Sequence, residues 1–239
     1  DQPAKLEIQE LSLYTKNIYI NPEINDLFTE KNNISLIRIH KQHVSKLTSP
    51  NQEILLSSLK YPIEILHFGF RPDINANVKL NPKYAFADWH KLAFMSRTCV
   101  PIPAMIPSLD PLFPNNYQLV VRTAKYIKCN PAVNTIGFTI HGNVLYQLTA
   151  EKFFSSYQNN TIPGIYPNDQ CGYYTISFSH YPTIFAPSGH VNNSTARELY
   201  INYESTRISS VDSATLYVSA QCINFLLYKD GSIKLKYIA

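Results

Sequence analysis

The sequence predicts an all-β protein, an antiparallel two-sheet sandwich with a long loop insertion and a few short helices. About ten segments are typical of strands, because apolar and polar residues alternate or β-branched residues follow one another. No strand–helix–strand alternation of the kind that builds parallel sheets is present. With 239 residues, the chain is long enough for one large all-β domain, so we expect a single domain over 1–239.

The clearest strand signal is 199–204, where Leu199, Ile201 and Tyr203 alternate with polar or mixed neighbours. The other predicted strands are 5–11, 18–20, 34–40, 63–70, 117–127, 135–148, 173–178, 214–228 and 233–238. Asp230-Gly231 fits the turn of a hairpin between the last two strands. The residues expected on the inner face of the sandwich are Ile37, Ile39, Ile65, Phe138, Leu199, Ile201, Leu216 and Phe225.

Three short helices are expected as connectors between the strands, because capping residues precede apolar residues at helical spacing. The start signals are Asn21 before Pro22, Ser49 paired with Gln52 as a capping box, and Thr149 before 150–157. None of these segments is long enough to form a helical layer. The strand count and the short helices fit a jelly roll or an immunoglobulin-like sandwich equally well.

The segment 71–116 interrupts the strand pattern, because it is rich in proline and has few strand signals. A loop of this length usually has a function or packs against a neighbour. Since proline restricts the unfolded chain, we expect an ordered excursion from the sandwich. The side chains expected to form a small apolar cluster there are Phe86, Trp89, Leu92 and Phe94, with Asp88 and His90 as polar supports.

Charge and cysteine content argue against several classes of protein. The net charge is +4, and no block of five basic residues occurs, so no specific nucleic-acid contact is predicted. The four cysteines include no CxxC pair, which argues against a zinc ribbon and favours buried free thiols. No apolar run approaches the ~20 residues that span a membrane, and no signal peptide is visible. Only 16% of residues are charged, which suggests surface covered by partners.

The sequence lacks the common spacings of catalytic and metal-binding residues. None of the seven histidines has His, Asp or Glu two residues later, the spacing that would place two metal ligands on one face of a strand. Asp88-Trp89-His90 has that spacing in reverse, and a structural hydrogen bond is the preferred interpretation. No nucleophile elbow and no glycine-rich phosphate loop is present. The sequence therefore predicts no enzyme and no catalytic, cofactor-binding or metal site.

A lectin-like module that binds a carbohydrate or receptor is the alternative function. Jelly rolls bind sugars with surface aromatic residues, and this chain has 17 Tyr. However, Trp89 is the only tryptophan and the tyrosines are scattered through the predicted strands, so core and subunit-interface roles are preferred.

One stretch, Pro187 to Tyr203, carries a distinctive pattern of a turn, a polar arm and a strand. It resembles the "PSGH-N-S-A-RE-YI" segment of major capsid proteins of nucleocytoplasmic large DNA viruses, of the African swine fever virus type. Matching segments occur in the same order at 35–41 (SLIRIHK), 58–64 (SLKYPIE), 88–91 (DWHK), 218–220 (VSA), 223–227 (INFLL), 230–232 and 235–237. The sequence departs from the family pattern at Tyr61, at Thr195 and through 73–117.

The resemblance implies a jelly roll, the C-terminal one of a double-jelly-roll capsid subunit, with 71–116 as its loop excursion. It implies a homotrimeric, pseudo-hexagonal capsomer in an icosahedral virion shell assembled in the host cytoplasm. The implied partners are the subunit's own N-terminal jelly roll, the other two subunits, neighbouring capsomers and minor capsid proteins. Because the chain starts at Asp1, inside the family pattern, we interpret it as a fragment or a processed piece.

Overall fold

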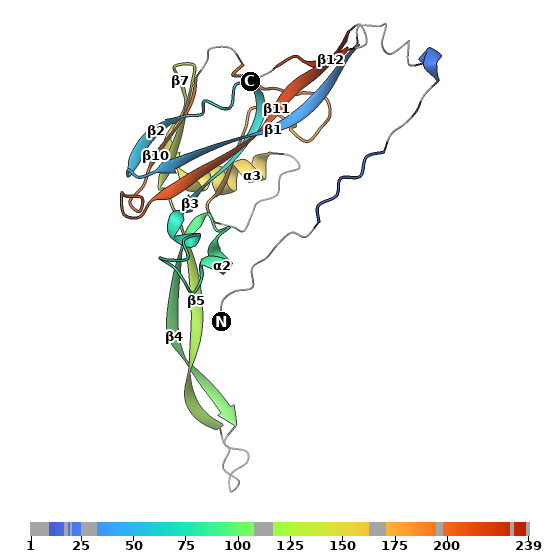
Figure 1. Ribbon diagram of the computed structural model, residues 1–239. Helices are drawn as coiled ribbons and strands as arrows, with labels where there is room; N and C mark the ends of the chain where they lie inside the picture. Colours follow the sequence, from blue (N-terminus) through green and yellow to red (C-terminus); the bar gives the residue numbers. More distant parts are fainter. Residues whose placement is uncertain are drawn as a thin grey trace. The chain divides into compact units, whose positions relative to one another are not determined.

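The computed structural model describes residues 10–16, 19, 21–24, 33–107, 117–162, 171–194, 198–229 and 232–237. The chain divides into two compact units, Leu36–Asn224 with Tyr237–Ala239 and Asp1–Ser35 with Phe225–Lys236. The larger unit holds the sandwich and the excursion (Figure 1). Most of the strands predicted at 5–11 and 18–20, and the turn at Asp230-Gly231, lie outside the described residues.

Two sheets form the sandwich. The strands of the first sheet, in spatial order, are β1 (Asn33–Leu47), β11 (Ala214–Lys229), β3 (Pro62–Pro72) and β8 (Tyr173–Ser177), with β9 (Val191–Asn192) beside β3. Those of the second are β2 (Asn51–Leu55), β10 (Leu199–Glu204), β6 (Thr135–Ile140) and β7 (Asn143–Ala150). β3 pairs antiparallel with β11 and β8, and β10 pairs antiparallel with β2 and β6. The predicted antiparallel two-sheet architecture is confirmed.

The core lies between the two sheets. Leu66, Phe68 and Phe70 alternate along β3 and all point into it, as period-2 geometry requires. The ring of Phe68 meets that of Phe138 from the other sheet, with centroids 5.3 Å apart. Edge-to-face aromatic contacts of this kind add to the stabilisation from apolar burial.

The predicted inner-face residues fall into two groups. Those in the core are Phe138, Leu199, Ile201 and Leu216, with Ile39 packed against it. Ile65 is buried but lies outside this core cluster, because a one-residue step along a strand reverses the face. Ile37 and Phe225 are only half-buried and are not core residues, so the prediction is wrong for these two.

Two local predictions are also wrong. The capping-box segment at Ser49 and Gln52 is not a helix, because 51–55 pairs with β10 as strand β2. The segment 135–148 is not one strand but the hairpin β6–β7. Its turn residues, His141 and Gly142, have φ values of 53° and 78°, as a type I′ turn requires.

The helices are short. Asn21 caps the helical residues 22–24, since its Oδ1 accepts a hydrogen bond from the Glu23 amide. Thr149 is not a cap, because it lies in β7 and its hydroxyl donates to the Gln147 carbonyl. The helical segments that follow are a π-helical turn (η2, Phe153–Tyr157) and α3 (Gln158–Thr161).

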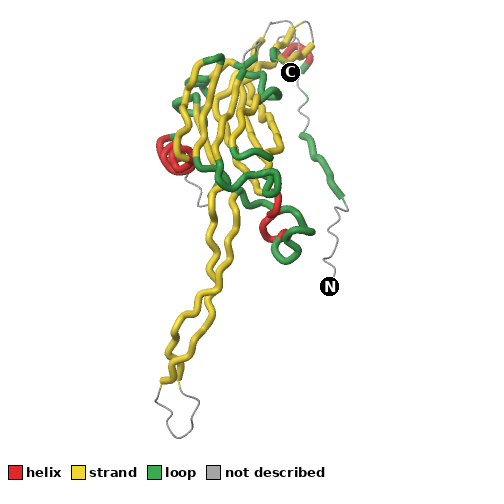
Figure 2. The backbone as a smooth tube through the Cα atoms, turned by 90° about the vertical axis from the view of Figure 1, so that its left-hand side faces the viewer, coloured by secondary structure: helices red, strands yellow, loops and turns green. Residues whose placement is uncertain are grey.

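The excursion is more regular than predicted. After the turn η1 (Asp73–Asn75) and helix α2 (Ala85–Asp88), β4 (Ala93–Pro107) and β5 (Tyr117–Pro131) pair in register over their whole length. The two strands form a ribbon that extends away from the sheets (Figure 2). Residues 93–107 are therefore strand and not loop, and the loop part of the excursion is 73–92.

Prolines fit this ribbon for a geometric reason. Pro101, Pro103 and Pro107 all occupy odd positions of β4, so their nitrogens share one side of the strand. Each strand of a two-stranded ribbon keeps one free edge, where a missing N–H removes no ladder hydrogen bond. Proline content alone therefore does not exclude a strand here.

In the smaller unit, β12 (Ser232–Leu235) pairs antiparallel with the end of β11, from Leu226↔Leu235 to Lys229↔Ser232. This confirms the predicted pairing of the last two strands.

All four cysteines are free thiols, as expected, but only one is fully buried. Burial raises the pKa of the Cys222 thiol to about 12. Cys99 and Cys129 are exposed on the β4–β5 ribbon, so the expectation of buried thiols is wrong for these two.

Candidate assembly surfaces

The segments with the most distinctive sequence patterns meet at a buried ion pair. Arg38 on β1 holds Glu64 on β3 through two hydrogen bonds, Nε–Oε2 at 2.6 Å and Nη2–Oε1 at 3.1 Å. The Glu64 side chain is fully buried, where a carboxylate without a partner is costly, and Arg38 supplies that partner. Gln221 also donates to Glu64, at 3.2 Å.

The same two donors hold a loop over the first sheet. Arg38 Nη2 donates to the Ile184 carbonyl at 2.7 Å, and Gln221 Nε2 donates to the Pro182 carbonyl at 3.0 Å. These hydrogen bonds join the Arg38, Glu64 and Gln221 side chains to one another and to the loop backbone. The Glu64 carboxylate therefore has a structural role beneath this loop.

The stretch from Pro187 to Tyr203 is similarly fixed by its own polar residues. The Ser188 hydroxyl accepts from the Tyr181 amide at 2.7 Å and lies 2.6 Å from the Ser179 hydroxyl. Asn193 is buried, and its side-chain amide donates to the Leu59 carbonyl at 2.6 Å. Thr195 and Arg197 lie outside the described residues. The described polar groups position backbone and form no constellation for bond chemistry.

Two ion pairs fix the excursion: Lys46–Asp73 joins it to the sandwich, and Arg97–Asp88 lies within it. Asp73 accepts hydrogen bonds from Lys46, Ser213 and Thr215. Burial would raise the pKa of the Asp73 carboxyl, but these hydrogen bonds and the charge of Lys46 outweigh it and lower the pKa. At the start of β4, Arg97 Nη2 lies 2.6 Å from both carboxylate oxygens of buried Asp88.

Leu92 anchors the end of the loop by packing. Asn75, buried, donates to the carbonyls of Lys91 and Ala93 and so holds the chain on both sides of Leu92. A Cβ at Gly69 would press on the Leu92 side chain, and one at Gly172 would overlap the Leu92 carbonyl. Gly172 also has φ of +90°, a conformation that favours glycine.

The expected apolar cluster around Trp89 does not form. Phe86 and Trp89 are 76% and 58% exposed, while Leu92 and Phe94 pack onto the sandwich. Asp88 binds Arg97 instead of supporting that cluster. The His90 ring packs edge-to-face against the Trp89 ring. The sequence alone does not indicate that Phe86 and Trp89 are exposed, because α2 is too short for the spacing of its apolar residues to define a buried face.

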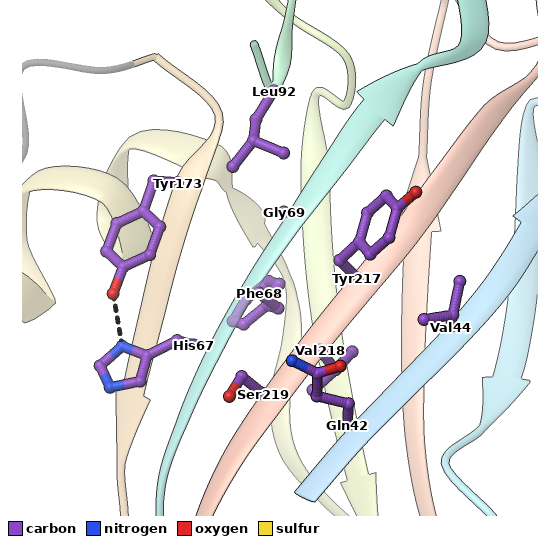
Figure 3. A pocket seen from close by; sticks show the side chains of 10 residues that line it. All are labelled: Gln42, Val44, His67, Phe68, Gly69, Leu92, Tyr173, Tyr217, Val218 and Ser219. Atoms are coloured by element: carbon purple, nitrogen blue, oxygen red, sulfur yellow. Dashed lines mark hydrogen bonds between the residues drawn. The ribbon is translucent and has the colours of Figure 1, made fainter. Parts of the chain in front are cut away.

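A pocket of about 180 Å³ opens on the outer face of the first sheet, beneath Leu92 (Figure 3). His67 and Tyr173 line one side, with the Tyr173 hydroxyl 2.6 Å from His67 Nδ1, and Tyr217 lines the other. Burial, with the charge of His40, lowers the pKa of His67. No carboxylate is among the side chains that line the pocket, and the Tyr173 hydroxyl is the polar partner of His67 there.

Within the described residues, no group of three or more His, Cys, Asp or Glu side chains is placed to hold a metal ion. None of the described helices is long and apolar enough to cross a membrane. The surfaces that stand out are instead the exposed aromatics of the excursion and the projecting ribbon.

No family model matches the chain. It is 32% identical over 254 residues to the major capsid protein of African swine fever virus isolate Pig/Kenya/KEN-50/1950, covering 98% of this chain and 38% of that protein. Hexon protein p72 of the Badajoz 1971 Vero-adapted strain gives 32% identity, over 98% of this chain and 37% of its own length. The chain thus spans less than two fifths of the length of these relatives.

Solved structures give the same result. The Faustovirus major capsid protein matches with a TM-score of 0.72 and 28% identity, over 89% of this chain and 37% of its own. The PBCV-1 virus capsid matches with a TM-score of 0.57 at 16% identity, over 92% of this chain and 55% of its own, which supports the fold alone. The sandwich is a jelly roll of the type these capsid proteins contain.

Proposed function

The chain is homologous to the major capsid protein of African swine fever virus, and on that premise we propose that it is the C-terminal jelly roll of a double-jelly-roll major capsid protein. The observation that carries the proposal is 32% identity extending over 98% of the chain. The proposed domain spans 1–239, with the excursion and ribbon as its insertion. Three subunits form a pseudo-hexagonal capsomer, and capsomers tile an icosahedral virion shell.

The proposed partners are an N-terminal jelly roll of the same subunit, two further subunits, neighbouring capsomers and minor capsid proteins. Assembly takes place in the host cytoplasm and involves no specific nucleic acid. The protein acts by burying surface between subunits and catalyses no reaction. Its most distinctive polar residues, such as Arg38 and Glu64, bind one another within the sandwich, which supports a structural role.

Electron microscopy of the purified full-length subunit, which includes the N-terminal jelly roll, tests this proposal directly. We expect particles with threefold symmetry, and a threefold sedimentation mass relative to the monomer. A carbohydrate-array screen tests the lectin-like alternative on the same sample. A monomer that binds a defined glycan would contradict the capsid role and favour the alternative.

A further inference from the structure

Charge is distributed unevenly along the chain. The excursion and ribbon, 73–131, contain seven Lys and Arg residues against three Asp and no Glu, a net charge of +4. That equals the net charge of the whole chain, so the remaining residues balance to zero. The excursion is therefore the basic part of an otherwise neutral chain.

The loop part of the excursion, 73–92, has three Lys against two Asp residues, a net charge of +1, and it also carries exposed apolar side chains. Its two carboxylates, Asp73 and Asp88, are both bound in ion pairs with Lys46 and Arg97. Exposed lysines lie on the same segment as the exposed aromatics; the residues concerned are Lys79, Lys83, Phe86 and Trp89. Exposed aromatic side chains are enriched at protein-binding surfaces, and lysines beside them favour a partner of opposite charge.

The second sheet presents the opposite character on its outer face. Strands β2, β10, β6 and β7 contain no Lys, Arg or His. Their inward positions are occupied by Ile54, Ile201 and Phe138, so the alternate positions face outward. The carboxylates on or beside this outward set are Glu53, Glu198 and Glu204, all exposed and without an ion pair among the described contacts.

Apolar side chains accompany those carboxylates. Leu55 pairs with Tyr200 and Val144 pairs with Thr139, both at outward positions. Leu55 is 40% and Val144 60% exposed. We call the outer face of the second sheet the acidic face. Its charge is opposite to that of the excursion, and both surfaces carry exposed apolar side chains.

The two surfaces of one chain are kept apart by the sandwich. Leu92 of the excursion rests on Gly69 and lines the pocket with Tyr217, on the outer face of the first sheet. The acidic face lies on the other side of the core. A contact between different patches of two identical chains is head-to-tail, and such contacts close into rings when the rotation allows.

We propose that the excursion of one copy docks on the acidic face of a second copy. The inference rests on the proposed capsomer function and names the surfaces that join its subunits. Lys79 and Lys83 meet Glu53 and Glu204, and the aromatics Phe86 and Trp89 meet the apolar positions of β2 and β7. Such contact buries the exposed aromatics and pairs the unneutralised charges.

A charge-reversal cycle on the full chain tests the inference, with self-association measured by sedimentation equilibrium. One variant carries Lys79→Glu and Lys83→Glu, a second carries Glu53→Lys and Glu204→Lys, and a third carries all four. Lys60→Glu, exposed and outside both surfaces, is the control. We expect each pair of reversals to weaken association about tenfold, because like charges then face one another. The fourfold variant should recover wild-type association, since every contact of a head-to-tail ring is again complementary.

Losses that add up in the fourfold variant, or reversals that leave association unchanged, would overturn the inference. If association is unchanged and threefold particles persist, the capsomer function still stands. If the Lys79 and Lys83 reversals abolish binding to heparin or to phosphatidylserine vesicles without affecting self-association, the lysines face an anionic ligand and the inference is wrong. A wild-type chain that stays monomeric would overturn the inference, while the capsomer function is decided by the subunit that includes the N-terminal jelly roll.

Discussion

The sandwich and the excursion differ in the burial of their aromatic side chains. In the sandwich, Phe68, Phe138 and Phe154 are buried and in mutual ring contact. In the excursion, Phe86 and Trp89 are exposed, and the segment is held by ion pairs and by the packing of Leu92. From this comparison we predict that stability and assembly depend on different regions. A core substitution should unfold the protein, and an excursion substitution should leave it folded but unable to assemble.

The largest expected effect is that of Phe138→Ala. Removing a fully buried ring leaves a cavity between the sheets and should lower the free energy of unfolding by about 3–5 kcal/mol. Urea unfolding followed by far-UV circular dichroism measures it. The matched control is Phe185→Ala, since Phe185 is 74% exposed on a surface loop. An equal loss of unfolding free energy in both variants would show that burial in the sandwich core does not determine stability.

The buried ion pair sharpens the comparison within the sandwich. Arg38→Met leaves Glu64 buried without its cation and should cost about 3–5 kcal/mol of unfolding free energy. Replacing both residues, Arg38→Met with Glu64→Leu, should recover most of that loss, because no unpaired charge remains. If the double variant is as unstable as the single one, the pair contributes attraction beyond compensating its own desolvation.

Backbone fit links the two regions at Gly172. Gly172→Ala should lower the unfolding free energy by about 1–3 kcal/mol, because φ is positive and the new Cβ meets the Leu92 carbonyl. Gly142→Ala is the control, since φ is also positive but nothing lies within 4 Å of the new Cβ. Similar losses in the two variants would mean that the contact with Leu92 contributes nothing.

A smaller effect is expected from pH. Burial and the charge of His40 lower the pKa of His67 in the folded protein, whereas the unfolded chain keeps the ordinary value of 6.5. Below pH 6.5 the unfolded state therefore binds more protons at this residue than the folded state does. Its contribution to stability is therefore present above pH 6.5 and is lost as the pH falls through the lowered value. We expect His67→Gln to reduce the drop in unfolding free energy between about pH 7.5 and about pH 5. An unchanged pH dependence would exclude His67 as a source.

Much of the sandwich was predictable because its strands have one buried face. The alternation of Leu199, Ile201 and Tyr203 predicted β10 with its observed bounds. The helix predicted from Ser49 and Gln52 was wrong because a capping-box pattern is a local signal, whereas the pairing of Glu53 with Asn202 depends on residues far apart in the sequence. The turn at His141 and Gly142 was missed although Gly142 is a turn signal, because apolar strand-like residues continue on both sides of it through 135–148.

The candidate surfaces were less predictable than the fold. The sequence placed Trp89 in an ordered excursion, but the direction of its side chain depends on how Asp88, Arg97 and Leu92 fix the loop. The ribbon was half predicted, since β5 has a strand pattern and β4 is interrupted by prolines. Once β2 is known to be a strand, the alternation of inward and outward side chains predicts the acidic face. The capping-box pattern in the sequence did not indicate that β2 is a strand.

The most direct test of the division between stability and assembly is the double variant Phe86→Ala with Trp89→Ala. Urea unfolding and sedimentation are measured together on the full chain, with Phe185→Ala as the control. We predict an unfolding free energy within about 0.5 kcal/mol of wild type and a loss of self-association, because both side chains are exposed in the single chain. A variant that unfolds by several kcal/mol more readily, while its folded fraction associates normally, would make the excursion part of the core and contradict this account.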